Sequence, residues 1–299
     1  MAAQDLPIVG DSFKLGFRFQ RYWDMPMANA FFACEFGAGM FLVSLLVNYV
    51  PGMIAGLVIG VGLKSFFHLT HMGVPLKSWR ALLRPDRSWI SRGLLGIVFF
   101  VCFGAAHIAN QWYGLSTAWN LPGFVGDLVR FGAGAAAVVC MTYQGLAMSH
   151  SSAISLWSTG LMPISSFVYS AASGVMLVLA TAWNSFLAER PDTRQMLITA
   201  GLFLCFAVVA VIVSLLHASR HGSPGARKSF ELLTQTLYAK WFYSLIWVVG
   251  IFVPVLVLWL TPTHAAIIIA TAAILLGHYA YRVLIFKAGV FEPIMSFRP

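Results

Sequence analysis

Residues 195–217 read QMLITAGLFLCFAVVAVIVSLLH, an apolar run that contains no Asp, Glu, Lys or Arg. A helix that crosses the hydrocarbon core of a bilayer needs about 20 predominantly apolar residues. The sequence therefore predicts a membrane-spanning helix here.

Seven other segments have the same character, so we expect an all-α integral membrane protein, a bundle of about eight transmembrane helices. The composition agrees, because 59% of the 299 residues are hydrophobic and only 10% are charged, against about 25% charged in an average soluble domain. The 26 Gly and ten Trp also suit a helical membrane protein. The predicted spans cover residues 26–49, 51–70, 93–113, 122–146, 161–186, 195–217, 239–260 and 264–285.

The chain divides simply around this bundle. Residues 1–25 form a predicted N-terminal segment that lacks the apolar region of a signal peptide. Residues 26–285 form the bundle, and 286–299 form a C-terminal tail. Eight spans place both termini on one side of the membrane.

The basic residues predict which side that is. Only Arg190 and Arg194 fall on the side opposite the termini, and Arg130 falls within a span. Basic residues accumulate on the cytoplasmic side of membrane proteins, so both termini are predicted to be cytoplasmic, and no nucleic-acid partner is needed to explain the net charge of +9. The sixteen residues assigned to the side of the termini are Lys14, Arg18, Arg21, Lys64, Lys77, Arg80, Arg84, Arg87, Arg92, Arg220, Arg227, Lys228, Lys240, Arg282, Lys287 and Arg298.

The cysteines argue against an intrinsic metal centre. Cys34, Cys102, Cys140 and Cys205 fall in four different apolar segments, and none forms a C-x-x-C pair. Zinc and iron–sulfur sites use clustered cysteines. We expect these four to be buried apolar side chains.

The loop between the second and third spans carries the most specific motif. Residues 68–93 read HLTHMGVPLKSWRALLRPDRSWISRG. His71-Met-Gly-Val-Pro75, then Trp79-Arg80, then Ser88-Trp-Ile-Ser91 resemble the signature of membrane-anchor subunits of the dimethyl sulfoxide reductase and polysulfide reductase type. The first span is also similar to the branch that oxidises phenylacetyl-CoA.

The resemblance implies a role in a multi-subunit oxidoreductase found in the bacterial cytoplasmic membrane. Such anchors hold a ferredoxin-like iron–sulfur subunit and a molybdopterin catalytic subunit, and they exchange electrons with a lipid quinone, menaquinone or ubiquinone. The family usually lacks haem, and the chain is not expected to catalyse a redox reaction alone. Some members of that family carry an acidic residue near the quinone, just after the Ser-rich stretch. This chain has Gly93 at that position, so we do not expect the same acidic site here.

Glu35 and Lys64 are the first candidate site residues, because ionisable groups inside a membrane are costly and are often functional. Both lie in the half of their spans near the termini. Glu35 in an apolar site would serve as a proton donor or acceptor for a quinone oxygen. The alternatives are a structural Glu35–Lys64 ion pair, or Lys64 reaching to the interface.

His68 and His71 follow Lys64 at helical spacing, on a face that continues a stripe of Gly52, Gly56 and Gly60. Neutral imidazole hydrogen-bonds a quinone carbonyl and carries its proton. The alternative is that both histidines cap the helix and anchor the loop. A quinone pocket formed by the first three spans is the functional prediction.

The loop 71–92 supplies the predicted docking residues. Arg and Trp are favoured in protein interfaces. The alternative is that the arginines of this loop only mark the cytoplasmic side of the membrane and contact lipid head groups. The candidates are Trp79, Arg80, Arg84, Arg87 and Trp89.

The polar residues of the far half allow a second cavity near His107, Asn110 and Gln111. Asp127 and Arg130 are spaced i, i+3, so we expect them to form a local ion pair.

Three rival functions remain open. A haem b-bearing quinone oxidoreductase subunit would pair His68 with His217 or His221 across facing helices. A secondary transporter would show two related halves with broken helices. A purely structural anchor predicts that Glu35→Gln leaves quinone-linked turnover intact, whereas the quinone-reactive subunit predicts a severe loss.

Overall fold

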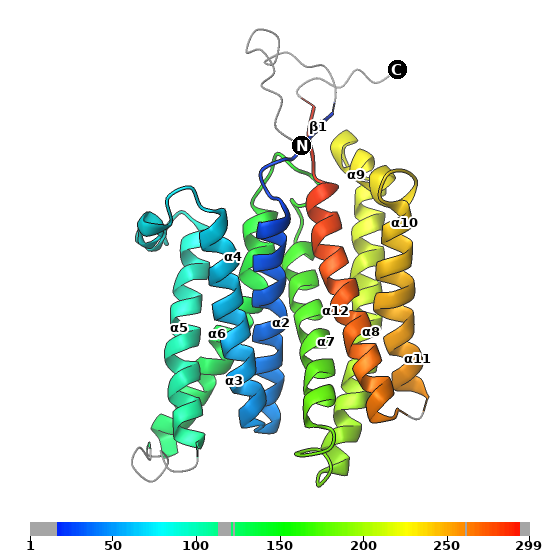
Figure 1. Ribbon diagram of the computed structural model, residues 1–299. Helices are drawn as coiled ribbons and strands as arrows, with labels where there is room; N and C mark the ends of the chain where they lie inside the picture. The colour runs from blue at the N-terminus through cyan, green and yellow to red at the C-terminus, as the bar shows by residue number, and fades with distance from the viewer. Residues whose placement is uncertain (1–16, 113–120, 122, 261, 294–299) are drawn as a thin grey trace.

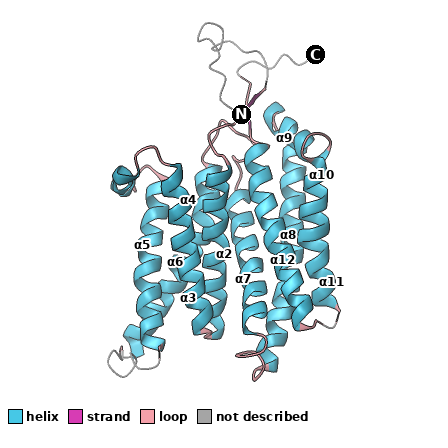
Figure 2. Ribbon diagram, in the orientation of Figure 1, coloured by secondary structure: helices cyan, strands magenta, loops and turns pink. Residues whose placement is uncertain are grey.

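The computed structural model describes residues 17–112, 121, 123–260 and 262–293, which form a bundle of long helices (Figures 1 and 2). Within these residues, eight helical segments are long and apolar enough to cross a membrane. They are α2 (Met25–Val47); α3 (Val50–Val58) with η1 (Ile59–Leu63) and α4 (Lys64–His71); α5 (Trp89–Gln111); α6 (Gly123–Ser149); α7 (Leu161–Ala182); α8 (Pro191–Arg220); α10 (Ala239–Trp241) with η3 (Phe242–Phe252) and α11 (Val253–Trp259); and α12 (His264–Lys287).

The two ends of the described chain meet at one end of the bundle, which we call the strand end. There β1 (Arg18–Phe19) pairs antiparallel with β2 (Val290–Phe291). The same end carries the 3-10 helix η2 (Pro75–Leu83), the α6–α7 connection and the short helix α9 (Pro224–Thr234) (Figure 1). The even number of spans thus brings both ends of the described chain to one side, as predicted.

Helices α2 and α7 form the centre of the bundle. In each, 72% of the most apolar window is buried inside the protein. Their backbones touch at Gly39 and Gly174, where a Cβ atom on either residue would clash with the backbone of the other helix. Small residues permit this close approach, which is how helices associate in a membrane where lipid is as apolar as the side chains.

Two of the spans contain π-helical turns. The second span passes through η1 before Lys64, and the seventh is π-helical over Phe242–Phe252. In the seventh span, Pro254 lies just after the π-helical segment and has no N–H to donate to the carbonyl of Gly250. Gly250 also lies against Gly277 of α12, with its hypothetical Cβ 2.6 Å from the Gly277 Cα.

Glu292 ties the C-terminal strand to the rest of the strand end. Its carboxylate accepts hydrogen bonds from the hydroxyls of Ser155 and Ser223 and, at 3.3 Å, from the Gly225 N–H at the start of α9. Partial burial alone would raise the pKa of Glu292, but these hydrogen bonds together hold it below its usual value. The carboxylate therefore connects the α6–α7 loop, α9 and the tail.

The predicted spans are confirmed as eight transmembrane-type helices, with ends that differ by a few residues. Two of the cations counted with the side of the termini, Lys64 and Arg282, lie inside their spans as the predicted bounds imply, and they are buried, 5% and 0% exposed. Twelve of the other basic residues lie at the strand end of the described chain, and only Arg190 and Arg194 lie at the opposite end. Residues 1–16 and 294–299, including Lys14 and Arg298, lie outside the described residues.

Candidate functional site

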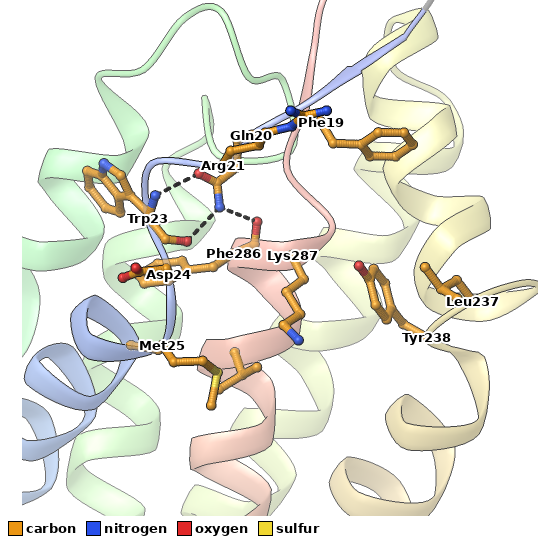
Figure 3. Close-up of a pocket in the computed structure, with 12 residues that line it drawn as sticks. Phe19, Gln20, Arg21, Trp23, Asp24, Met25, Leu237, Tyr238, Phe286 and Lys287 are labelled. Carbon is orange, nitrogen blue, oxygen red and sulfur yellow. Dashed lines mark hydrogen bonds between the residues drawn. The ribbon is translucent and has the colours of Figure 1, made fainter. Parts of the chain in front are cut away.

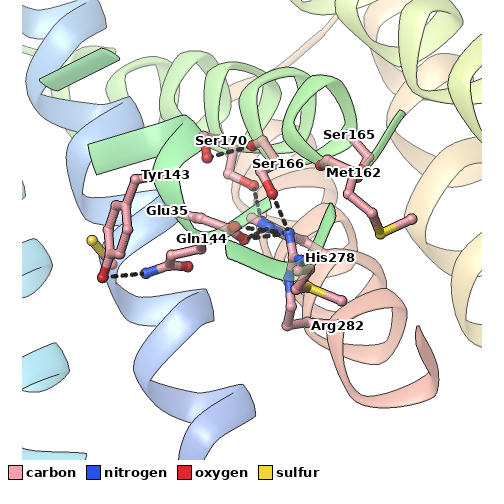
Figure 4. Close-up of polar contacts among 12 residues, drawn as sticks. Glu35, Tyr143, Gln144, Met162, Ser165, Ser166, Ser170, His278 and Arg282 are labelled. Atoms are coloured by element: carbon pink, nitrogen blue, oxygen red, sulfur yellow. Dashed lines mark hydrogen bonds and ion pairs between the residues drawn. The ribbon is translucent and has the colours of Figure 1, made fainter. Parts of the chain in front are cut away.

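Glu35 is the centre of a buried ionic cluster. Its two carboxylate oxygens accept hydrogen bonds from Arg282 Nη2 at 2.7 and 2.8 Å, and Oε2 lies 3.0 Å from His278 Nε2 (Figure 4). None of the three side chains is exposed. His278 and Arg282 are four residues apart on α12, so both face α2 from one side of their helix.

The groups around the cluster come from a third helix, α7. Arg282 Nη2 also lies 3.0 Å from the hydroxyl of Ser166, and His278 Nδ1 lies 3.0 Å from the hydroxyl of Ser173. The ring of Tyr169 stacks on His278 with centroids 4.8 Å apart. The carboxylate, the guanidinium and the imidazole therefore join α2, α7 and α12 at one level of the bundle.

Gln144 of α6 extends the cluster toward Lys64. With its amide nitrogen directed to Phe31 O at 3.0 Å and Glu35 Oε1 at 3.2 Å, its oxygen accepts from Lys64 Nζ at 3.3 Å. Lys64 also donates to the hydroxyl of Tyr143. Gln144 is fully buried, and Lys64 and Tyr143 are 5% and 6% exposed.

We call these residues the buried network: Glu35, Lys64, Tyr143, Gln144, Ser166, His278 and Arg282. It draws on five of the eight spans, and Glu35 lies ten residues into α2, about 15 Å from the strand end at 1.5 Å per residue. The network contains one carboxylate, that of Glu35, and two cationic side chains, those of Lys64 and Arg282. Glu35, Lys64, Tyr143 and His278 can each accept or release a proton, and neighbouring members lie within hydrogen-bond distance of one another.

The direct Glu35–Lys64 ion pair, one of the alternatives that the sequence left open, does not form in the described residues. Gln144 stands between the two side chains, and Arg282 provides the charge partner. Glu35 does lie near Lys64, as the depths of their spans predicted, but it is not in an apolar site. The glycine stripe accounts for the closeness, because Gly56 and Gly60 pack directly on the backbone of α2 at Gly37 and Phe41.

The two predicted histidines lie apart from this network. His68 is half-buried, and its Nδ1 has no hydrogen-bond partner among the described residues. His71 lies at the end of α4, where its Nδ1 is 3.5 Å from a carboxylate oxygen of Asp24. His71 thus anchors the helix end, which is the alternative that the sequence left open for it.

The predicted docking loop is exposed at the strand end. No residue of η2 is buried, and Leu76 and Trp79 are 90% and 56% exposed. Arg80 lies over the Trp79 ring, 5.7 Å from its centroid. Apolar and cationic side chains therefore share one uncovered segment.

The remaining docking candidates divide into two groups. Arg84 and Arg87 are exposed, and Arg87 contacts Asp86 at 3.1 Å. Trp89 is half-buried and donates to His150 Nδ1 at 3.0 Å, so it fastens the start of α5 to the end of α6.

At the end opposite the strands, the predicted Asp127–Arg130 ion pair is wrong for the described residues. Arg130 donates instead to the carbonyl of Leu45 at 3.2 Å, and Asp127 is exposed. His107 is buried, with neither ring nitrogen bonded to a described residue.

The histidines of the haem alternative are not brought together. His68 lies on α4 in one half of the bundle, and His217 and His221 lie on α8 in the other, with α2 and α7 between them (Figure 1). The two α8 rings contact each other instead, with centroids 4.7 Å apart.

Three of the four cysteines are buried as predicted, whereas Cys102 of α5 is exposed.

The sequence interpretation missed Tyr143, Gln144, Ser166, His278 and Arg282. One signal was available: a His and an Arg four residues apart inside an apolar span place two costly polar groups on one face. Ser166 and Gln144 carry no comparable signal. Neither a protein-family model nor a curated protein sequence matches this chain.

Proposed function

We propose that this chain is the membrane-anchor subunit of a multi-subunit oxidoreductase. It exchanges electrons and protons between a partner iron–sulfur subunit and the quinone pool of the membrane. The catalytic subunit of the complex carries a molybdopterin. The strand end faces the cytoplasm of a bacterium, where these partners dock.

The observation that carries the proposal is the exposed segment η2 together with the residues on either side of it. Its position matches the motif in residues 68–93 that resembles anchor subunits. Leu76 and Trp79 are uncovered among cations, a combination suited to an interface with an acidic partner.

The buried network supports the proton part of the proposal. Reduction of a quinone consumes two electrons and two protons, so proton-exchanging groups are required near the ring. Lys64 belongs to α4, the helix that leads into η2, and it is joined through Gln144 to Glu35. One member of the network, Lys64, therefore lies on the helix that leads into the proposed docking segment.

The first test is to purify the chain by a tag in mild detergent with its native partners. We expect molybdenum or tungsten, abundant iron and no reduced b-type bands in the visible spectrum. Haem bands would favour a haem-bearing subunit. A chain that remains alone and metal-free under several mild detergents and after crosslinking in the intact membrane would contradict the anchor proposal.

The second test separates proton exchange from folding. Glu35→Gln alone leaves Arg282 buried without its carboxylate, so lost turnover would be ambiguous. The double variant Glu35→Gln/Arg282→Gln removes both charges together. If the folded double variant assembles with its partners, we expect quinone-linked turnover to fall at least tenfold, and full turnover would make the network purely structural.

A further inference from the structure

A groove opens on the side of the bundle between α12, the start of the seventh span and the beginning of α2. Two adjoining cavities of about 360 and 400 Å³ form it. Both are lined by Met25, Leu237, Tyr238, Val283 and Lys287. The packing explains its position: α12 touches the seventh span backbone to backbone at Gly250 and Gly277, and the groove begins beyond that contact, toward the strand end.

The inner part of the groove is apolar. On α12 it is lined by Leu276, Ala280 and Val283, which are spaced to share one helix face. Leu245 and Trp241 line the other wall. The distance along α12 from Leu276 to Lys287 is about 16 Å at 1.5 Å per residue, which is roughly half of a hydrocarbon core of about 30 Å. The groove therefore has the length of one leaflet.

The outer part of the groove is polar and carries cations. Arg21 and Lys287 both line it, and both are exposed. Figure 3 shows the side chains of Lys287 and Tyr238 pointing into the space between α12 and the turn before α10. Neither Arg21 nor Lys287 forms a hydrogen bond or an ion pair with another residue in the described ranges.

One carboxylate, that of Asp24, also lines this outer part, the mouth of the groove. It lies 3.5 Å from His71 Nδ1, on the side toward α4. The mouth therefore keeps an excess of positive charge. Trp241, 51% exposed, lies at the same end, where tryptophan side chains mark the level of the lipid head groups.

We propose that this groove binds one anionic phospholipid. The phosphate lies between Lys287 and the Tyr238 hydroxyl, Arg21 adds positive charge at the rim of the groove, and an acyl chain lies along Leu276, Ala280 and Val283. Basic pockets between transmembrane helices recognise anionic head groups in this way, and the apolar trough supplies the remaining binding energy. The proposal requires no partner subunit, so it is independent of the proposed function.

The test uses the purified full chain in nanodiscs that contain a trace of a phospholipid with a photoactivatable acyl chain. Phosphatidylglycerol and phosphatidylcholine probes with identical chains are compared. We expect phosphatidylglycerol to label residues 237–245 and 276–287 at least fivefold more than phosphatidylcholine, since each basic residue near the surface contributes roughly this factor.

Two variants and one control sharpen the result. Arg21→Gln/Lys287→Gln should abolish the preference for phosphatidylglycerol, whereas Arg220→Gln removes an exposed cation at the same end and should leave it unchanged. Val283→Trp fills the trough and should reduce labelling by both probes. Each variant is compared with wild type by gel filtration, so that loss of folding is recognised.

Three outcomes would overturn the proposal. Equal labelling by the two probes would show that the groove does not recognise an anionic head group. Labelling confined to other segments would show that the phospholipid does not bind in the groove. Displacement of the probe by a short-chain quinone, but not by unlabelled phosphatidylglycerol, would make the groove a quinone site instead.

Discussion

At the scale of single residues, the central feature is the ion pair that Glu35 and Arg282 form inside the bundle. Each is fully buried, and two hydrogen bonds join the guanidinium to the carboxylate. A buried ion pair adds little net stability compared with an apolar pair, but removing one partner leaves an uncompensated charge in a low-dielectric interior.

We expect Arg282→Gln to lower the free energy of unfolding by about 3–5 kcal/mol. The double variant with Glu35→Gln should lose less than the sum of the two single changes, because it leaves no lone charge. Thermal unfolding of the detergent-solubilised protein, followed by gel filtration, measures each variant. Additive losses in this cycle would mean that the two side chains do not depend on each other.

Glu292 gives a pH dependence of known sign. Its pKa is lower in the folded protein than the ordinary value of 4.5, so its contribution to stability is complete above pH 4.5 and is lost as the pH falls below it. We expect the difference in melting temperature between wild type and Glu292→Gln to be constant at neutral pH and to narrow below about pH 4.5. A difference that widens with acid would contradict the hydrogen bonds that we assign to this carboxylate.

The sequence identified Glu35 and Lys64 as costly groups but not their partners. Arg282 was counted only among the charges on the side of the termini, because it lies near the end of its span, and its contact with Glu35 joins residues 247 positions apart. Hydropathy measures depth along one helix only. It contains no information about which helices are neighbours or which faces they turn toward each other.

At the scale of elements, the close contacts between helices depend on particular glycines. The apolar length of each span was sufficient to predict its existence and approximate ends. The π-helical turns of the second and seventh spans were not predictable, because their residues are as apolar as those of an ordinary helix. In the seventh span, Pro254 supplies no N–H for the regular hydrogen bonds of the helix.

Gly39→Ala should lower the free energy of unfolding by about 1–3 kcal/mol, because its methyl group would clash with the Ser170 carbonyl of α7. Gly62→Ala is the matched control. No atom lies within 4 Å of a Cβ at Gly62, so its effect should stay within about 1 kcal/mol and favour the helix. Equal effects of the two substitutions would show that α2 and α7 are not in backbone contact.

At the scale of the whole molecule, the strand end holds most of the described basic residues, the paired strands β1 and β2, and the exposed segment η2 (Figure 1). An excess of Lys and Arg in short loops marks the cytoplasmic side. The opposite connections contribute only Arg190 and Arg194.

We therefore expect a fluorescent protein fused at the C-terminus to fold and fluoresce in bacterial cells. Alkaline phosphatase fused after Leu187, in the connection between α7 and α8, should be active, because that enzyme matures only outside the cytoplasm. The reverse pattern would invert the orientation and remove the proposed cytoplasmic docking face.

The pairing of Glu35 with Arg282 also has a consequence for biosynthesis. The ribosome makes α2 first and α12 last, and at about 5–20 residues per second the 247 residues between the paired side chains take roughly 12–50 s to synthesise. During that interval the nascent α2 holds a carboxylate whose final partner does not yet exist. The first helix must therefore wait beside the insertion machinery, or with its carboxylate protonated, until the last helix arrives and completes the bundle.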